Sequence, residues 1–359
     1  MMVMALCIPF HRLNTNLPKV STMDDQLDVP IYHVLALSGG GYRALYTATI
    51  LKEFEEVLGK PIASHFDLIC GTSAGGLLAL GLASEIPASE LKVLFEKQGK
   101  EIFASRDFKR KGLGFWKKAK HSNAGLRAVL ERRFGTTTIG ELKHRVLIPS
   151  VNYTTGKGQF FKTPHHPTFE RDYQMTLVDV ALATSAAPVY FPSVRNDRGV
   201  FVDGGLVGNA PGLFGLHEIR TFLAHDRNAR VRVLAIGTMT VGATVSGGRD
   251  LDQGVMGWGT TLFDLVISAQ ESSVDYMLTQ SLREDYFKID DQVTPQQSRD
   301  VKGLDDVSVA STNTLRDRGI AAAQKALGDS RFRPFRDHHP AAPVFYHGPN
   351  KNSEDLINA

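Results

Sequence analysis

One stretch, residues 66–82, constrains the fold of this chain more than any other. Residues 66–70 form an apolar run typical of a buried strand, and residues 74–82 form one typical of a buried helix. Between them, Gly-Thr-Ser-Ala-Gly matches G-x-S-x-G, the nucleophile elbow, in which a sharp strand-to-helix turn exposes a serine hydroxyl. Gly71 and Gly75 lack a Cβ, so the strand and the helix can close on the turn. A bare match is often only structural, but these flanking segments favour Ser73 as a nucleophile.

Another strand and helix precede the elbow. Residues 32–38 contain a continuous apolar run, expected of a strand covered on both faces, and residues 42–58 have helical spacing. Strand, helix, strand, elbow and helix in this order make a βαβα unit, which favours an α/β fold with a parallel sheet. Further apolar strands are predicted at residues 145–152, 199–203 and 230–237.

Three consecutive glycines, Gly39, Gly40 and Gly41, connect the first strand to the first helix. Their N–H groups can converge on an anion, and the dipole of the following helix adds to the attraction. Such donors stabilise the oxyanion that forms when a serine attacks a carbonyl group, and the N–H of Ala74 is a further candidate. A phosphate-binding loop or a plain tight turn is the alternative, but the elbow that follows favours an oxyanion hole. Arg43 could steady the loop, bind a phosphate or lie at the surface.

A serine nucleophile needs a base, and the sequence offers two kinds. One is a histidine in a Ser-His-Asp triad, as in α/β-hydrolases. The other is Asp203, which ends an apolar strand, because sites of parallel sheets form where strands end. Gly204 and Gly205 follow it and let a substrate or another backbone come close. We favour Asp203 as the base over a helix-capping role. The candidate histidines, none of them in a recognisable loop after a strong strand, are His217, His225, His338, His339 and His347.

Composition narrows the classes of protein further. Of the 359 residues, 42% are hydrophobic and 22% are charged, which is typical of a globular protein with a sizeable core. The net charge of +3 is too small to indicate a nucleic-acid polymer as a partner. Two cysteines, Cys7 and Cys70, cannot build a disulfide framework and favour a reducing compartment. We expect no signal peptide, because the apolar residues 1–10 lack a charged start and a small-residue cleavage site. We expect no transmembrane segment, because glycines and the elbow divide the uncharged run at 68–84.

Two further features involve basic side chains. In the segment 106–121, lysines and arginines surround Phe108, Phe115 and Trp116. This segment fits a solvated loop, a patch that docks on anionic lipid headgroups, or a contact to nucleotide phosphates. His165 and His166 are adjacent, but no Cys, Asp or Glu stands at ligand spacing around them. We therefore expect surface histidines and no metal site there.

Taken in order, the motifs resemble those of the patatin-like phospholipase family. Residues 38–44, Ser-Gly-Gly-Gly-Tyr-Arg-Ala, are similar to its D-G-G-G-x-R-G loop, residues 71–75 to its elbow, and residues 203–205 to its D-G-[GA] motif. Residues 183–188 resemble the segment that commonly precedes that aspartate. The resemblance implies a three-layer α/β/α fold with a mostly parallel central sheet. It also implies a Ser73–Asp203 dyad that hydrolyses lipid esters, phospholipase A-like, with no metal or other cofactor required. Ser38 and Ala44 depart from the pattern, but neither supplies an oxyanion donor.

The overall build also resembles the bacterial patatin-like effectors of anti-phage signalling, which cyclic dinucleotides activate. This resemblance implies a cyclic dinucleotide activator, membrane phospholipids as substrate and a cytoplasmic protein that acts at the inner membrane surface. We divide the chain into a leader (1–29), a catalytic domain (30–290) and a helical addition with a loose tail (291–359). Homo-oligomerisation stays open. The alternative from another class is a nucleotide- or membrane-binding signalling protein without turnover.

Overall fold

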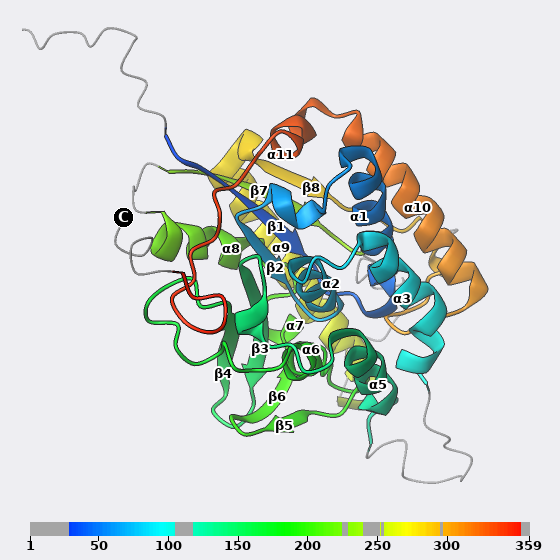
Figure 1. Cartoon of the computed structure of the whole chain (residues 1–359). Helices are drawn as coiled ribbons and strands as arrows, with labels where there is room; N and C mark the ends of the chain where they lie inside the picture. The colour runs from blue at the N-terminus through cyan, green and yellow to red at the C-terminus, as the bar shows by residue number, and fades with distance from the viewer. Residues whose placement is uncertain are drawn as a thin grey trace, which may run out of the picture.

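A mixed eight-stranded sheet runs through the computed structural model, which describes residues 29–104, 118–224, 229–239, 252, 255–294 and 297–352. The strand order is β5-β6-β3-β2-β1-β7-β8, and β4 pairs with β3 outside this path (Figure 1). The strands are β1 (Ile31–Leu37), β2 (Leu68–Gly71), β3 (Val146–Asn152), β4 (Lys157–Lys162), β5 (Val194–Asn196), β6 (Gly199–Asp203), β7 (Arg230–Ile236) and β8 (Tyr286–Ile289).

Strands β3, β2, β1 and β7 run parallel, as the sequence predicts, and β8 continues the parallel order at the edge of the sheet. Leu37 at the end of β1 pairs with Gly71 of β2 and with Ile236 of β7. The carboxyl ends of these three strands therefore meet at one edge of the sheet. Gly39 and Ser73 follow directly at that edge. Helices on both faces bury β2 completely, which explains its uninterrupted apolar sequence.

Strand β6 runs antiparallel to β3, which corrects the expectation that Asp203 ends a strand of the parallel sheet. Asp203 nevertheless reaches the same edge. The reason is that β3 continues to Asn152, beyond the end of β2, and Asp203 pairs with Ser150. The register of β6, not its direction, brings the carboxylate to the level of the elbow.

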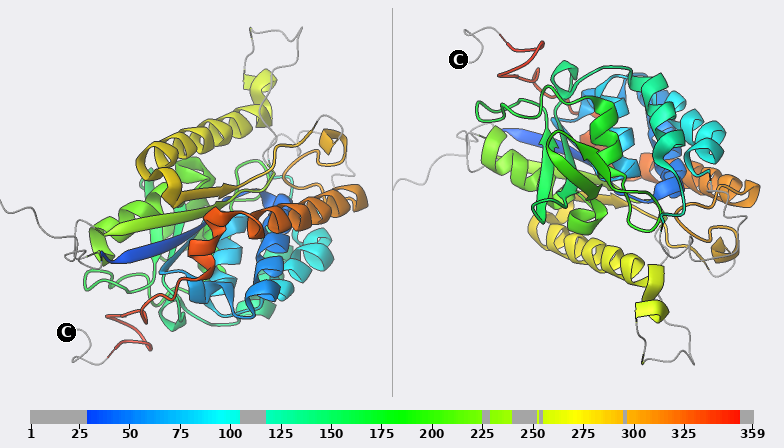
Figure 2. Two further views of the ribbon diagram at one scale, coloured as in Figure 1. Left: turned by 90° about the horizontal axis from the view of Figure 1, so that it is seen from above. Right: turned by 90° about the horizontal axis from the view of Figure 1, so that it is seen from below.

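Helices cover both faces of the sheet and complete the expected three layers. The larger hydrophobic core lies under α1, α2, α3, α5, α6 and α10, and the smaller one lies under α8 and α9. Figure 2 shows α9 on one side of the sheet and α1, α3 and α10 on the other. The helices are α1 (Ala44–Leu58), α2 (Ala74–Ala83), α3 (Ala88–Ile102), α5 (Asn123–Phe134), α6 (Leu177–Thr184), α7 (Gly205–Gly208), α8 (Gly212–Glu218), α9 (Val255–Leu282), α10 (Val309–Leu327) and α11 (Arg333–Arg336).

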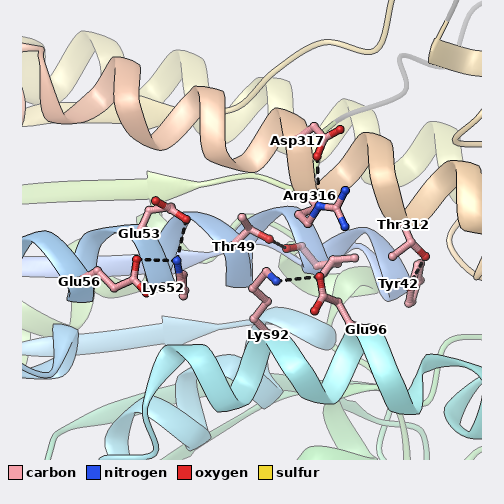
Figure 3. A network of polar contacts seen from close by, with 11 residues as sticks. Tyr42, Thr49, Lys52, Glu53, Glu56, Lys92, Glu96, Thr312, Arg316 and Asp317 are labelled. Atoms are coloured by element: carbon pink, nitrogen blue, oxygen red, sulfur yellow. Dashed lines mark hydrogen bonds and ion pairs between the residues drawn. The ribbon is translucent and has the colours of Figure 1, made fainter.

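Helix α10, late in the chain, packs along α1, the first helix (Figure 3). The two approach closely at Gly319, where a Cβ would lie 2.9 Å from the carbonyl oxygen of Tyr46. Tyr42 and Thr312 share a hydrogen bond of 2.7 Å between their hydroxyl groups (Figure 3). Leu315 of α10 belongs to the same core as α1. The end of the chain therefore contributes to the core that supports the first strands.

The described residues do not test the predictions about the leader, most of the basic segment and the domain division. All of the predicted leader except its last residue lies outside the described part, as does the basic segment as far as residue 117. The division between a catalytic domain and a C-terminal addition stays a prediction. In the described parts of the chain, no helix combines the length and the apolar character that a membrane span requires.

Candidate active site

Ser73 occupies the turn between β2 and α2, as the elbow pattern predicts. Its φ of 53° and ψ of −126° lie outside the regions that L-residues favour. A Cβ at Gly71 would lie 2.2 Å from the carbonyl oxygen of Gly75, and one at Gly75 would lie 2.3 Å from that of Leu37. Only glycine fits at these two positions. The Ser73 N–H donates to Thr184 Oγ1 at 3.0 Å, which helps to hold the strained residue.

The Ser73 hydroxyl donates a hydrogen bond to Asp203, with 2.7 Å between Oγ and Oδ2. The Gly205 N–H donates to the other carboxylate oxygen, also at 2.7 Å. Asp203 is only 2% exposed and contacts no cation among the described residues. Burial raises its pKa to about 7, although the hydrogen bonds from Gly205 and Ser73 partly oppose the shift. A carboxylate of this pKa can accept a proton at neutral pH, as a general base must.

The glycine loop lies against Ser73, because a Cβ at Gly39 would be 3.0 Å from the Cβ of Ser73. One expectation is corrected here. The Gly39 N–H donates to the carbonyl oxygen of Asn209 at 3.1 Å, so it is not available to an oxyanion. Three of the expected donors border the pocket and have no acceptor among the described residues, namely the N–H groups of Gly40, Gly41 and Ala74.

A segment near residue 304 shapes the glycine loop from the other side. Gly41 has a φ of +56°, and a Cβ there would lie 2.2 Å from the carbonyl oxygen of Leu304. The same oxygen accepts a hydrogen bond from the Tyr42 N–H at 2.7 Å. The next residue, Asp305, pairs with Lys120 at 2.5 Å, at the end of the basic segment. A stretch that we assigned to the C-terminal addition thus forms one wall of the site.

Arg43 lies between the glycine loop and the pocket. Its backbone N–H donates to the carbonyl oxygen of Gly40 at 3.1 Å, and its guanidinium donates to that of Met239 at 3.2 Å. Burial lowers the pKa of the guanidinium, and nearby acids, Glu271 foremost, oppose the shift. Arg43 steadies the loop and places positive charge beside the pocket, so it is not a plain surface residue.

A pocket of about 440 Å³ contains Ser73 and Asp203, and different elements give it different chemistry. Mainly apolar side chains come from α2, α3, α5 and the segment 185–192. They are Leu77, Phe95, Ile102, Phe103, Leu126 and Phe191. Charged and polar side chains come mainly from the glycine loop, α9 and residues 302–304. They include Arg43, Asn209, Asp264, Glu271 and Lys302.

Known proteins with similar sequences point to the same kind of active site. Residues 35–212 match the family model described as patatin-like phospholipase. A relative from Pseudomonas aeruginosa (strain BWHPSA011 / Pa011), named cGAMP-activated phospholipase, is 71% identical over 324 residues, which cover 90% of this chain and 97% of the relative. The chain belongs to the patatin-like phospholipase family. A second relative with the same name, from Vibrio cholerae, is 36% identical and covers 82% of this chain and 93% of its own.

In this patatin-like phospholipase no described histidine lines the pocket of Ser73. His338 instead bonds the carboxylate of Asp67 at 2.8 Å, and His347 bonds the carbonyl oxygen of Pro167 at 2.7 Å. His225 lies outside the described residues. The triad alternative therefore has no candidate base in the described part of the chain, whereas Asp203 touches the serine.

His165 is buried in this patatin-like phospholipase, so the expectation of two surface histidines is wrong for it. Its Nε2 lies 3.1 Å from Glu218 Oε1, and its Nδ1 lies 2.8 Å from Thr163 Oγ1. Lys162 Nζ pairs with the same Glu218 carboxylate at 2.6 Å. Within the ranges that the structure describes, no group of three or more His, Cys, Asp or Glu is placed to hold a metal ion.

Three residues of the site were missed in the sequence: Asn209, Glu271 and Leu304. For Asn209, its position shortly after Asp203 was a usable signal. Glu271 lies in a long helix whose pattern does not mark it, and Leu304 acts through its backbone carbonyl group. Nothing local identifies the last two.

Proposed function

We propose that this protein is a lipid acyl hydrolase that cleaves membrane phospholipids with a Ser73–Asp203 dyad and is activated by a cyclic dinucleotide. One observation carries the catalytic part. The strained Ser73 hydroxyl donates to a buried carboxylate at 2.7 Å, beside backbone N–H groups that border the same pocket.

The reaction has two halves, and Asp203 handles the proton in both. Ser73 Oγ attacks the ester carbonyl carbon as its proton passes to Asp203, and the oxyanion accepts hydrogen bonds from Gly40, Gly41 and Ala74. The tetrahedral intermediate collapses, and the leaving lysophospholipid alcohol takes the proton from Asp203. Asp203 then removes a proton from water, which attacks the acyl-serine. Release of the fatty acid returns the proton to Ser73.

The lining of the pocket supports a phospholipid as substrate. A fatty acyl chain suits the apolar residues from α2, α3 and α5, because their burial of its methylene groups is favourable. A phosphate-bearing headgroup suits the side with Arg43 and Lys302, whose cations attract it. The scissile ester then lies between them, next to Ser73.

The proposed activator comes from the two relatives, both named cGAMP-activated phospholipase. We assign the same class of ligand, a cyclic dinucleotide and first of all cGAMP, to this chain. We further propose that the activated enzyme acts at the inner membrane surface in anti-phage defence. Such a ligand acts by binding the active state more tightly than the inactive state.

The test is fatty-acid release from vesicles of bacterial phospholipids, with wild type and Ser73→Ala side by side. Each is measured with cGAMP, with a linear dinucleotide of the same bases, and without nucleotide. We expect release only from the wild type and only with cGAMP. Release by Ser73→Ala at the wild-type rate would exclude the dyad, and equal release without nucleotide would exclude the activation.

A further inference from the structure

Three consecutive glycines impose no preferred backbone conformation on the oxyanion loop. Other contacts must therefore set the directions of the Gly40 and Gly41 N–H groups. A trans peptide unit is planar, and its N–H points away from its C=O. The Gly40 N–H shares a peptide unit with the Gly39 carbonyl, and the Gly41 N–H shares one with the Gly40 carbonyl. Whatever binds these two carbonyl groups thus aims the two donors.

Different partners bind the two carbonyl groups. The Gly40 oxygen accepts from the Arg43 N–H at 3.1 Å. The Gly39 oxygen accepts from Asn209 Nδ2 at 3.0 Å and from Thr238 Oγ1 at 3.2 Å. The Gly39 N–H also donates to the Asn209 carbonyl oxygen at 3.1 Å, so Asn209 hydrogen-bonds both the N–H and the C=O of this glycine.

Glu271 on α9 decides which end of the Asn209 amide faces the loop. Asn209 Nδ2 donates to Glu271 Oε1 at 2.6 Å, as well as to the Gly39 oxygen. A side-chain amide has a donor end and an acceptor end of similar shape, whereas an ionised carboxylate only accepts. The reversed amide would place Asn209 Oδ1 against two oxygen atoms. Glu271 therefore selects the orientation in which Asn209 holds Gly39.

Charge and burial are consistent with this arrangement. The Asn209 side chain is buried, at 3% exposure, so an unmet amide would be costly there. Burial raises the pKa of Glu271, and the charge of Asp290 adds to the shift, while the hydrogen bond from Asn209 and the positive charge of Arg43 oppose it. Glu271, which holds Asn209, thus lies within electrostatic range of Arg43, which binds the other carbonyl group of the loop.

We propose that Glu271 is a positioning residue for the reaction, which acts through Asn209 to aim the Gly40 N–H at the oxyanion. This inference rests on the proposed function. The oxyanion exists only in the transition states and tetrahedral intermediates. Loss of Glu271 should therefore lower kcat and leave KM nearly unchanged.

The experiment uses the full chain with cGAMP and phospholipid vesicles and compares three variants. Glu271→Leu removes the acceptor and should lower kcat about 100-fold, with KM within about twofold. Glu271→Gln keeps an acceptor oxygen and should restore kcat to within about fivefold of wild type. Asp275→Asn is the matched control, because Asp275 lies one turn further along α9 and bonds Tyr286 Oη at 2.9 Å instead. It should leave kcat unchanged.

A second measurement, the rate at which a fluorophosphonate labels Ser73, needs no lipid. The labelling rates of the variants should rank in the same order as their kcat values, because the adduct places a phosphoryl oxygen where the oxyanion forms. The proposal would be overturned if Glu271→Leu kept the wild-type labelling rate and the wild-type kcat. It would also be overturned if Asp275→Asn lost as much of both as Glu271→Leu does. Glu271→Ala serves if the leucine variant does not fold. Lipid hydrolysis absent in the wild type would count against the proposed function, while labelling would still test Glu271.

Discussion

Two carboxylates in this molecule are almost equally buried, yet their surroundings are opposite. Asp203 is 2% exposed and Glu218 is 1% exposed. Asp203 has a serine hydroxyl and one backbone N–H as partners, and burial raises its pKa to about 7. Burial would also raise the pKa of Glu218, but the His165 imidazole and the Lys162 ammonium together bring it below its ordinary value. Burial alone therefore does not decide what a carboxylate can do.

The contrast separates a carboxylate that can exchange a proton from one that cannot near neutral pH. The Lys162 ammonium keeps Glu218 ionised, and their ion pair links β4 to α8. Without such a cation, Asp203 changes charge near pH 7, which suits a base and costs folding free energy. Two substitutions and one pH series test this difference. Changes at Asp203 should mainly alter activity, and changes at Glu218 should mainly alter stability.

The largest effect is expected for activity in Asp203→Asn. Asparagine keeps the size of the side chain but cannot accept the serine proton, so kcat should fall about 10³- to 10⁴-fold. The variant should also unfold at a higher temperature than wild type at pH 8, by about 2 °C or more, because it has no buried charge. Ester hydrolysis and thermal unfolding measure the two changes. A variant that keeps a tenth of wild-type kcat would contradict the assignment of the base.

The second effect concerns stability in Glu218→Ala. The substitution leaves the Lys162 ammonium and the His165 N–H without their acceptor and should lower the free energy of unfolding by about 3 kcal/mol. Urea denaturation at pH 7.5 measures it. Glu284→Ala is the control, because Glu284 is an exposed partner of Arg230 and should matter by about 0.5 kcal/mol or less. At 20 °C the folded Glu218→Ala protein should keep kcat within about threefold of wild type. A loss of activity as large as that of Asp203→Asn would remove the distinction.

The smallest effect is the pH dependence. Asp203 must be ionised to accept a proton, so kcat/KM should rise about tenfold per pH unit below pH 7 and level off above it. The folded pKa exceeds the ordinary value of 3.8, so ionisation of Asp203 should lower stability as the pH rises from about 4 to 7. Glu218 has the opposite sign, and its contribution is lost as the pH falls. A soluble short-chain ester allows measurement from pH 5 to 9. A flat profile from pH 5 to 7 would contradict the raised pKa of Asp203.

The sequence predicts the parts of the site that depend on neighbours in the chain. Ser73, its flanking glycines and the glycine loop are local patterns, and the structure places them where expected. Asp203 was expected at the right edge, although the antiparallel pairing of β6 means that register brings it there. The partners of Glu218 and Glu271 could not be predicted. His165 and Glu218 are 53 residues apart, and Asn209 and Glu271 are 62 residues apart, with no periodic signal that connects them.

The contact of Leu304 with the glycine loop has a consequence for the order of synthesis. The elbow, the loop and Asp203 leave the ribosome long before residue 304 does. Until then, the Tyr42 N–H lacks its acceptor and the pocket lacks one wall. A nascent chain therefore carries both reactive residues without a finished site. Any fragment that stops at residue 290 carries the same defect permanently.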